Sequence, residues 1–128
     1  MVPQSELNTR LAALQQALVV EGLDAALVVQ HADLFYFCGA VNRAILYVPT
    51  AGTPLLFALP GSERIREETL FPRIEKLSRQ ENLPALLQEH GYALPKSIGL
   101  ESDVLPAALH SRLAGLFPGA RLADVSGS

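Results

Sequence analysis

The sequence has one cysteine and no tryptophan, and only 6% of its residues are aromatic. A single cysteine cannot form an internal disulfide, so the chain lacks the crosslinks typical of small secreted proteins. No apolar run approaches the roughly 20 residues that a membrane-spanning helix needs. The segment MVPQSELNTR at the start has neither the basic region nor the apolar stretch of a secretory signal. These absences predict a soluble, cytoplasmic protein.

Charge is also sparse. Only 18% of the residues are charged, the formal net charge is −3, and the basic residues are scattered along the chain. We therefore expect no nucleic-acid partner and no membrane partner. Apolar residues, in contrast, make up 49% of the 128 positions, which is enough for a sizeable core. The length is that of one α/β domain and too short for two.

The first regular pattern is helical. Leucines recur at intervals of four, three and four residues from Leu7 to Leu18, which places them on one face of a helix over 5–21. Ser5 is suited to the N-cap of this helix, and Gly22 stands where a C-terminal glycine belongs.

Short apolar segments between turn residues predict strands. The segment 25–29 is continuously apolar, which suits a buried central strand. The turn PTAGT at 49–53 is short enough for a hairpin, so at least one strand pair is antiparallel. The predicted strands cover 25–29, 44–48, 54–59, 73–77, 97–100 and 120–125, and the further helices or turns cover 32–38, 62–71, 81–90 and 106–116. This alternation predicts an α/β fold, a three-layer domain with a mixed, roughly six-stranded sheet flanked by helices.

Motifs for metal binding, phosphate binding and nucleophilic catalysis are missing from the sequence. It contains no HExxH, CxxC, EF-hand loop, GxGxxG or GxxxxGK[ST]. GLESD at 99–103 resembles half of a nucleophile elbow, but the required G-x-S-x-G is absent. Two of the candidate metal ligands, His90 and His110, suit solvated helix positions, and the candidates as a set show no recognisable ligand spacing. The full set of candidates is His31, His90, His110, Asp33 and Asp103. We therefore predict no catalytic centre and no cofactor within this chain.

Three residues between the predicted strands 25–29 and 44–48 have more than one interpretation. Cys38 could be a thiolate near His31, but it lies at the end of its helix, where the dipole disfavours an anion, so a buried inert cysteine is favoured. Arg43 could present its planar fork to a carboxylate, or cap carbonyls, or pair with a surface acid. Tyr36 could contact a substrate or be a core aromatic with a hydrogen-bonded hydroxyl.

The segment GLDA at 22–25, followed by Val28, Asp33, Tyr36 and Gly39, resembles the start of the creatinase/prolidase N-terminal domain. The likeness continues in the same order along the chain, through RAILYV at 43–48, IGLE at 98–101, LP at 105–106, PGA at 118–120 and DVS at 124–126. The ordered set covers nearly the whole chain. It implies such a domain over 1–125, with 126–128 as a tail or as the start of a linker to a C-terminal catalytic domain.

The resemblance implies a parent protein of the Xaa-Pro aminopeptidase, prolidase and creatinase group. In its peptidases a separate C-terminal domain holds two divalent metals, commonly manganese or cobalt, through two aspartates, a histidine and two glutamates. Creatinase has the same fold without the metals. None of those ligands can be assigned in this sequence. The resemblance therefore implies a non-catalytic domain that packs in a homodimer or larger homo-oligomer and covers an active site.

The resemblance also implies that Arg43 lines a substrate site, possibly that of a neighbouring subunit, with Asn42 and Tyr36 nearby. The residues leave a second class of function open, a stand-alone module for dimerisation or for binding a small carboxylate at Arg43. The sequence departs from the family pattern at three positions, which leaves the substrate preference open: Asp33 replaces an asparagine, Cys38 a threonine or serine, and Ala40 a bulky aromatic.

Overall fold

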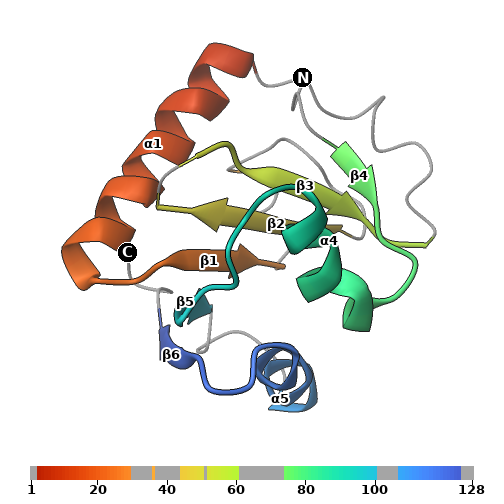
Figure 1. Ribbon diagram of the computed structural model, residues 1–128. Coiled ribbons are helices and arrows are strands. Elements are labelled where there is room, and N and C mark those ends of the chain that lie inside the picture. Colours follow the sequence, from red (N-terminus) through yellow and green to blue (C-terminus); the bar gives the residue numbers. More distant parts are fainter. Residues whose placement is uncertain are drawn as a thin grey trace.

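The computed structural model describes residues 3–29, 36, 44–50, 52–60, 74–100 and 107–124. These residues form a six-stranded sheet with helices on both faces (Figure 1). The elements are α1 (Gln4–Glu21), β1 (Ala25–Val28), β2 (Ala44–Pro49), β3 (Leu55–Ala58), β4 (Ile74–Lys76), the 3-10 helix η1 (Gln80–Asn82), α4 (Leu83–Glu89), β5 (Ser97–Leu100), α5 (Ala107–Leu116) and β6 (Arg121–Asp124). The predicted three-layer α/β fold is confirmed.

The strand order is β4-β3-β2-β1-β5-β6, which places β1 in the interior of the sheet, as its apolar sequence predicts. β2 pairs antiparallel with both β1 and β3, whereas β1–β5, β3–β4 and β5–β6 are parallel pairs. The sheet is therefore mixed, and the predicted hairpin joins β2 to β3. All six predicted strands are present, with ends that differ from the prediction by no more than two residues.

Successive residues of the central strands point to opposite faces of the sheet and so supply two separate apolar clusters. On one face, the leucines of α1 pack against residues such as Ala26 and Leu46. On the other face, α4 and α5 pack against residues such as Leu27 and Phe57. Because β1 and β2 are covered on both faces, each of their residues is buried.

Of the two caps predicted for α1, only the C-terminal one is present. Gly22 ends the helix in the left-handed conformation, with φ +70°, and the N–H of Leu23 donates to the carbonyl of Leu18 at 2.9 Å, the pattern of a Schellman cap. The prediction of Ser5 as N-cap is wrong, because Pro3 occupies that position without a side-chain cap. The Pro3 carbonyl accepts the N–H groups of Glu6 and Leu7 instead, so the helix begins one residue earlier than predicted.

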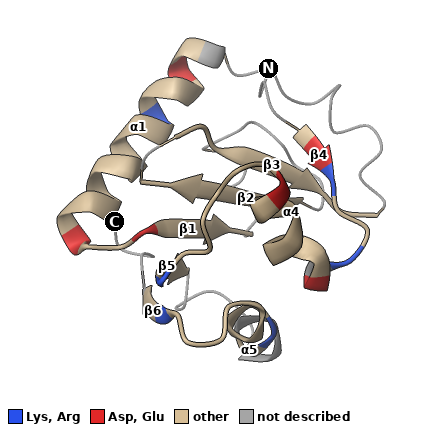
Figure 2. Cartoon of the chain, in the orientation of Figure 1, with Lys and Arg blue, Asp and Glu red and all other residues tan. Residues whose placement is uncertain are grey.

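The predicted helix 62–71 lies outside the described residues, as does the predicted helix or turn 32–38 except for Tyr36. Among the described helices, none combines the length and the apolarity needed to cross a membrane. Figure 2 shows acidic and basic residues interspersed along the described elements, which matches the scattered charge of the sequence.

Two glycine substitutions should shift stability in opposite directions. Gly22→Ala forces a side chain into positive φ and should lower the free energy of unfolding by about 1 kcal/mol. Gly115 lies within α5, where an added methyl group meets nothing within 4 Å. Gly115→Ala should therefore raise the free energy of unfolding by about 0.5–1 kcal/mol. Urea unfolding of both variants tests the pair, and equal shifts would contradict the left-handed cap.

Candidate functional site

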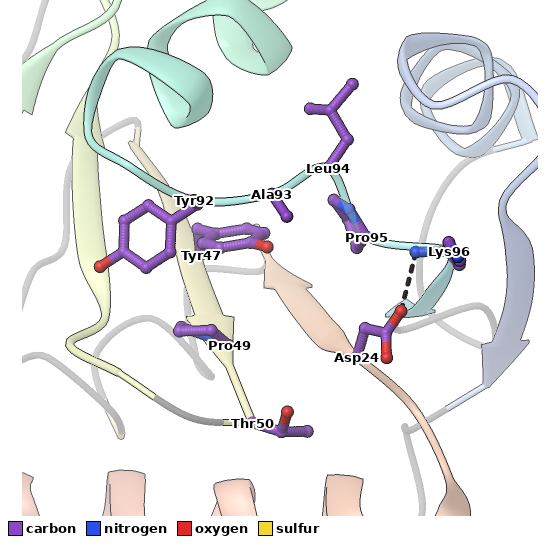
Figure 3. A pocket seen from close by; sticks show the side chains of 9 residues that line it. All are labelled: Asp24, Tyr47, Pro49, Thr50, Tyr92, Ala93, Leu94, Pro95 and Lys96. Carbon is purple, nitrogen blue, oxygen red and sulfur yellow. Dashed lines mark hydrogen bonds between the residues drawn. The ribbon is translucent and has the colours of Figure 1, made fainter.

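A pocket of about 430 Å³ opens where the start of β1, the end of β2 and the segment before β5 come together (Figure 3). The segment 92–96 connects α4 to β5 and supplies more than half of the lining. The lining residues are Asp24, Tyr47, Pro49, Thr50, Tyr92, Ala93, Leu94, Pro95 and Lys96. The residues that line the pocket thus include one aspartate, one lysine and two tyrosines among mainly apolar neighbours.

Asp24 is fixed in place by the two strands that flank β1. Its N–H donates to the Ser97 hydroxyl at 2.9 Å and approaches the Ser97 carbonyl at 3.2 Å. Its carbonyl accepts the N–H of Thr50 at 3.0 Å, and its carboxylate Oδ2 accepts the N–H of Lys96 at 2.8 Å. The backbone of Asp24 therefore holds the carboxylate at the pocket wall through contacts with both neighbouring segments.

The turn after β2 is anchored from α1. Gln15 Nε2 donates to the carbonyl oxygens of Pro49 at 2.7 Å and of Gly52 at 3.1 Å. The Tyr92 hydroxyl donates to the carbonyl of Thr53, which ties the segment before β5 to the same turn. The pocket is therefore framed by three segments that are distant in sequence and joined by hydrogen bonds.

Tyr47 forms the deepest polar part of the pocket. Only 2% of its surface is exposed, and its ring packs edge-to-face on Tyr92 with centroids 5.6 Å apart. Burial, followed by the neighbouring Tyr92 and Asp24, raises the pKa of Tyr47 to about 12. The phenol therefore keeps its proton at neutral pH and can donate a hydrogen bond.

The sequence-predicted site residues do not line this pocket within the described part of the chain. Arg43 and Asn42 lie outside the described residues, so their substrate role stays a prediction. Tyr36 is 51% exposed and is therefore not the core aromatic considered above. Arg10 of α1 donates from Nη1 to the Tyr36 carbonyl at 2.7 Å, and its guanidinium carbon lies 4.4 Å from the centroid of the Tyr36 ring.

The other candidate groups give no metal centre among the described residues. His90 follows the last turn of α4, where its N–H donates to the carbonyl of Leu86. Within the described residues, no three histidine, cysteine, aspartate or glutamate side chains come together. The side chains of Cys38, His31 and Asp33 lie outside the described part of the chain.

The residues that line the pocket are not among those predicted from the sequence. Tyr47 is the one tyrosine in an otherwise aliphatic strand, and YALPK at 92–96 carries a tyrosine and a lysine directly before another strand. These signals mark polar groups at strand ends. Their spacing in the sequence gives no indication that the two segments lie side by side.

Comparisons with known proteins agree on the fold. A sequence model of the Creatinase/Prolidase N-terminal domain matches residues 10–128. The N-terminal domain of an X-Pro dipeptidase from Streptococcus pyogenes is 20% identical, with a TM-score of 0.76 over 93% of this chain and 95% of that one. The N-terminal domain of the cytoplasmic peptidase PepQ from Mycobacterium tuberculosis is 23% identical, with a TM-score of 0.74 over 93% and 94% of the two chains.

A longer solved structure is matched over only part of its length. The X-Pro aminopeptidase from Thermotoga maritima is 21% identical, with a TM-score of 0.74, and the match covers 91% of this chain but 33% of that one. The chain thus spans about a third of that enzyme. No curated protein sequence gives a significant match.

The buried phenol of Tyr47 gives a pH-dependent prediction. Because its pKa is raised to about 12, the folded state keeps this proton between pH 10 and 12, whereas the unfolded state releases it. The free energy of unfolding should be insensitive to this group below pH 10 and should fall as the pH rises above it. In Tyr47→Phe the fall should be smaller by about 1–3 kcal/mol, measured by urea unfolding across that range.

Tyr36→Phe is the matched control, since it removes a tyrosine that is exposed. It should leave the alkaline fall unchanged. Equal pH profiles for wild type and Tyr47→Phe would show that the Tyr47 hydroxyl titrates as freely in the folded as in the unfolded chain.

Proposed function

The chain belongs to the creatinase/prolidase N-terminal domain family, and on that premise we propose that it is the non-catalytic N-terminal domain of an Xaa-Pro dipeptidase or aminopeptidase. The observation that carries this proposal is the family match over residues 10–128. The likeness to domains taken from X-Pro peptidases supports it, because the same fold occupies about a third of the full-length enzyme of Thermotoga maritima. The remaining length of such an enzyme would supply the reaction chemistry.

The chemistry of the pocket supports a binding role rather than a hydrolytic one. Hydrolysis of a peptide bond needs an activated nucleophile and a group that stabilises the developing charge. The lining residues offer a carboxylate held by a backbone N–H, a lysine and the phenol of Tyr47, which stays protonated at neutral pH. These groups can orient a ligand. In our proposal the two divalent metals, manganese or cobalt, bind in the catalytic domain.

We assign two tasks to the domain in the whole enzyme, contact with another subunit and covering of an active site. Val19 and Val20 support the contact role, because they are adjacent apolar residues near the end of α1 and are 58% and 83% exposed. The helix face that carries Leu11, Leu14 and Leu18 is already used by the sheet. The two valines therefore offer apolar area that a second subunit can bury.

Peptidase activity should require more than this chain. The purified 128-residue chain should not hydrolyse an alanyl-proline dipeptide with added Mn²⁺, whereas the product of the complete reading frame that contains it should. Prolyl-alanine, with the residue order reversed, serves as the specificity control. Light scattering on the same samples should give a dimer or larger oligomer for the active product. Hydrolysis by the 128-residue chain, or by neither sample, would contradict the proposal.

Arg43→Ala in that longer product tests the predicted substrate contact. Loss of a charge-assisted hydrogen bond to the substrate carboxylate should lower kcat/KM for the Xaa-Pro dipeptide by roughly tenfold to a hundredfold. Arg112→Ala is the control, because Arg112 is an exposed arginine on α5, and it should keep kcat/KM within about twofold. Equal effects of the two substitutions, with unchanged thermal unfolding, would remove Arg43 from the substrate site.

A further inference from the structure

The pocket beside β1 carries an inference that does not depend on the proposed peptidase role. We propose that it binds an amino-acid residue through the protonated α-amino group and the adjacent carbonyl oxygen, either as a free amino acid or as the N-terminal residue of a peptide. The ammonium donates to Asp24, the carbonyl oxygen accepts from Tyr47, and an apolar side chain lies against Pro49 and Pro95.

The buried Tyr47 hydroxyl lacks a hydrogen-bond partner among the described residues, which points to a ligand. The residue is 98% buried, and among the described residues no hydrogen-bond partner of this hydroxyl is found. Figure 3 shows the hydroxyl on the side of the ring that faces Pro95 and Asp24. A buried hydroxyl without a partner is costly, whereas a ligand oxygen in the pocket would satisfy it. Since the group stays protonated at neutral pH, it acts as a donor to that oxygen.

Asp24 supplies the complementary acceptor. It is the only carboxylate in the pocket lining, and one of its two oxygens, Oδ2, accepts the N–H of Lys96 at 2.8 Å. The second oxygen is available to a donor, because a carboxylate accepts through both oxygens. The pair of a carboxylate and a phenol donor therefore matches the ammonium and carbonyl groups of an amino acid.

The size and wall chemistry of the pocket fit one residue. Its volume of about 430 Å³ lies near the lower end of the range for small-molecule sites, roughly 300–1,000 Å³. Pro49 and Pro95 supply apolar lining, whereas Figure 3 shows the Leu94 side chain pointing away from Tyr47 and Asp24. An apolar ligand side chain packed against the two prolines would remove apolar surface from water. The pocket therefore favours a residue such as leucine over glycine.

The charge of Lys96 distinguishes the two possible ligands, a free amino acid and the N-terminal residue of a peptide. Lys96 lines the same pocket as Asp24, so its long, flexible side chain can bring the ammonium group to the carboxylate of a free amino acid. A peptide has a neutral carbonyl at that position and gains nothing from this charge. L-leucine and L-leucinamide share the ammonium, the carbonyl oxygen and the side chain, and differ only in the carboxylate. A comparison of these two ligands therefore identifies the source.

The experiment is a titration of the uniformly ¹⁵N-labelled 128-residue chain, followed through the backbone amide signals. L-leucine should shift the signals of pocket residues such as Tyr47 and Lys96 saturably, with a Kd on the order of millimolar. Glycine and N-acetyl-L-leucine, which lack the side chain and the ammonium respectively, should bind at least about tenfold more weakly. Tighter binding of L-leucine than of L-leucinamide identifies a free amino acid as the ligand, and equal binding identifies a peptide N-terminus.

Two conservative variants test the assigned atoms. Tyr47→Phe, which removes one hydroxyl, should raise the Kd for L-leucine about fivefold, and Asp24→Asn, which removes the charge, about tenfold or more. Glu81→Gln is the control, because Glu81 is an exposed glutamate in η1 outside the pocket, and it should leave the Kd unchanged. The proposal is overturned if no saturable shift appears at the pocket, if N-acetyl-L-leucine binds as well as L-leucine, or if both pocket variants bind like wild type.

These outcomes are separate from those of the peptidase assay. Loss of amino-acid binding leaves the assignment to the N-terminal domain of a peptidase intact. An inactive full-length product leaves the binding measured on the 128-residue chain intact.

Discussion

The hydrogen bonds around Asp24 set the position of β1 between its two neighbours, and the rest of the structure depends on that position. The N–H of Asp24 is held by Ser97 at the start of β5, and its carbonyl is held by Thr50 at the end of β2. Ser97 is buried, and its hydroxyl also approaches the carbonyl of Gly22. One junction thus fixes an antiparallel and a parallel neighbour of the same strand.

The position of β1 also determines how the two apolar clusters form. A strand that is fixed on both sides presents alternate residues to α1 on one face and to α4 and α5 on the other. Every residue of β1 and β2 is buried as a result, and removal of this apolar surface from water is the main stabilising contribution. The left-handed cap at Gly22 contributes by turning the chain directly from α1 toward Asp24.

The same junction makes the pocket possible. The backbones of Asp24 and Thr50 are hydrogen-bonded where β1 begins and β2 ends, and the N–H of Lys96, just before β5, donates to the side-chain carboxylate of Asp24. These bonds position the three residues at the ends of interior strands. A site built on strand ends is more rigid than one built on loops alone. This rigidity is what a domain needs if it is to bind a small ligand or cover an active site without supplying the reactive groups itself.

The sequence by itself determined the fold class, the six strands, the central place of β1, the C-terminal cap of α1 and the family, because apolar periodicity and turn residues act locally. It failed at Ser5, since the fixed φ of Pro3 makes that residue the better helix start. Only the tertiary structure brought Tyr47 beside Asp24 and the segment 92–96, and left Tyr36 exposed against Arg10. Strand order decides such contacts, and it depends on long-range pairing that no local pattern records.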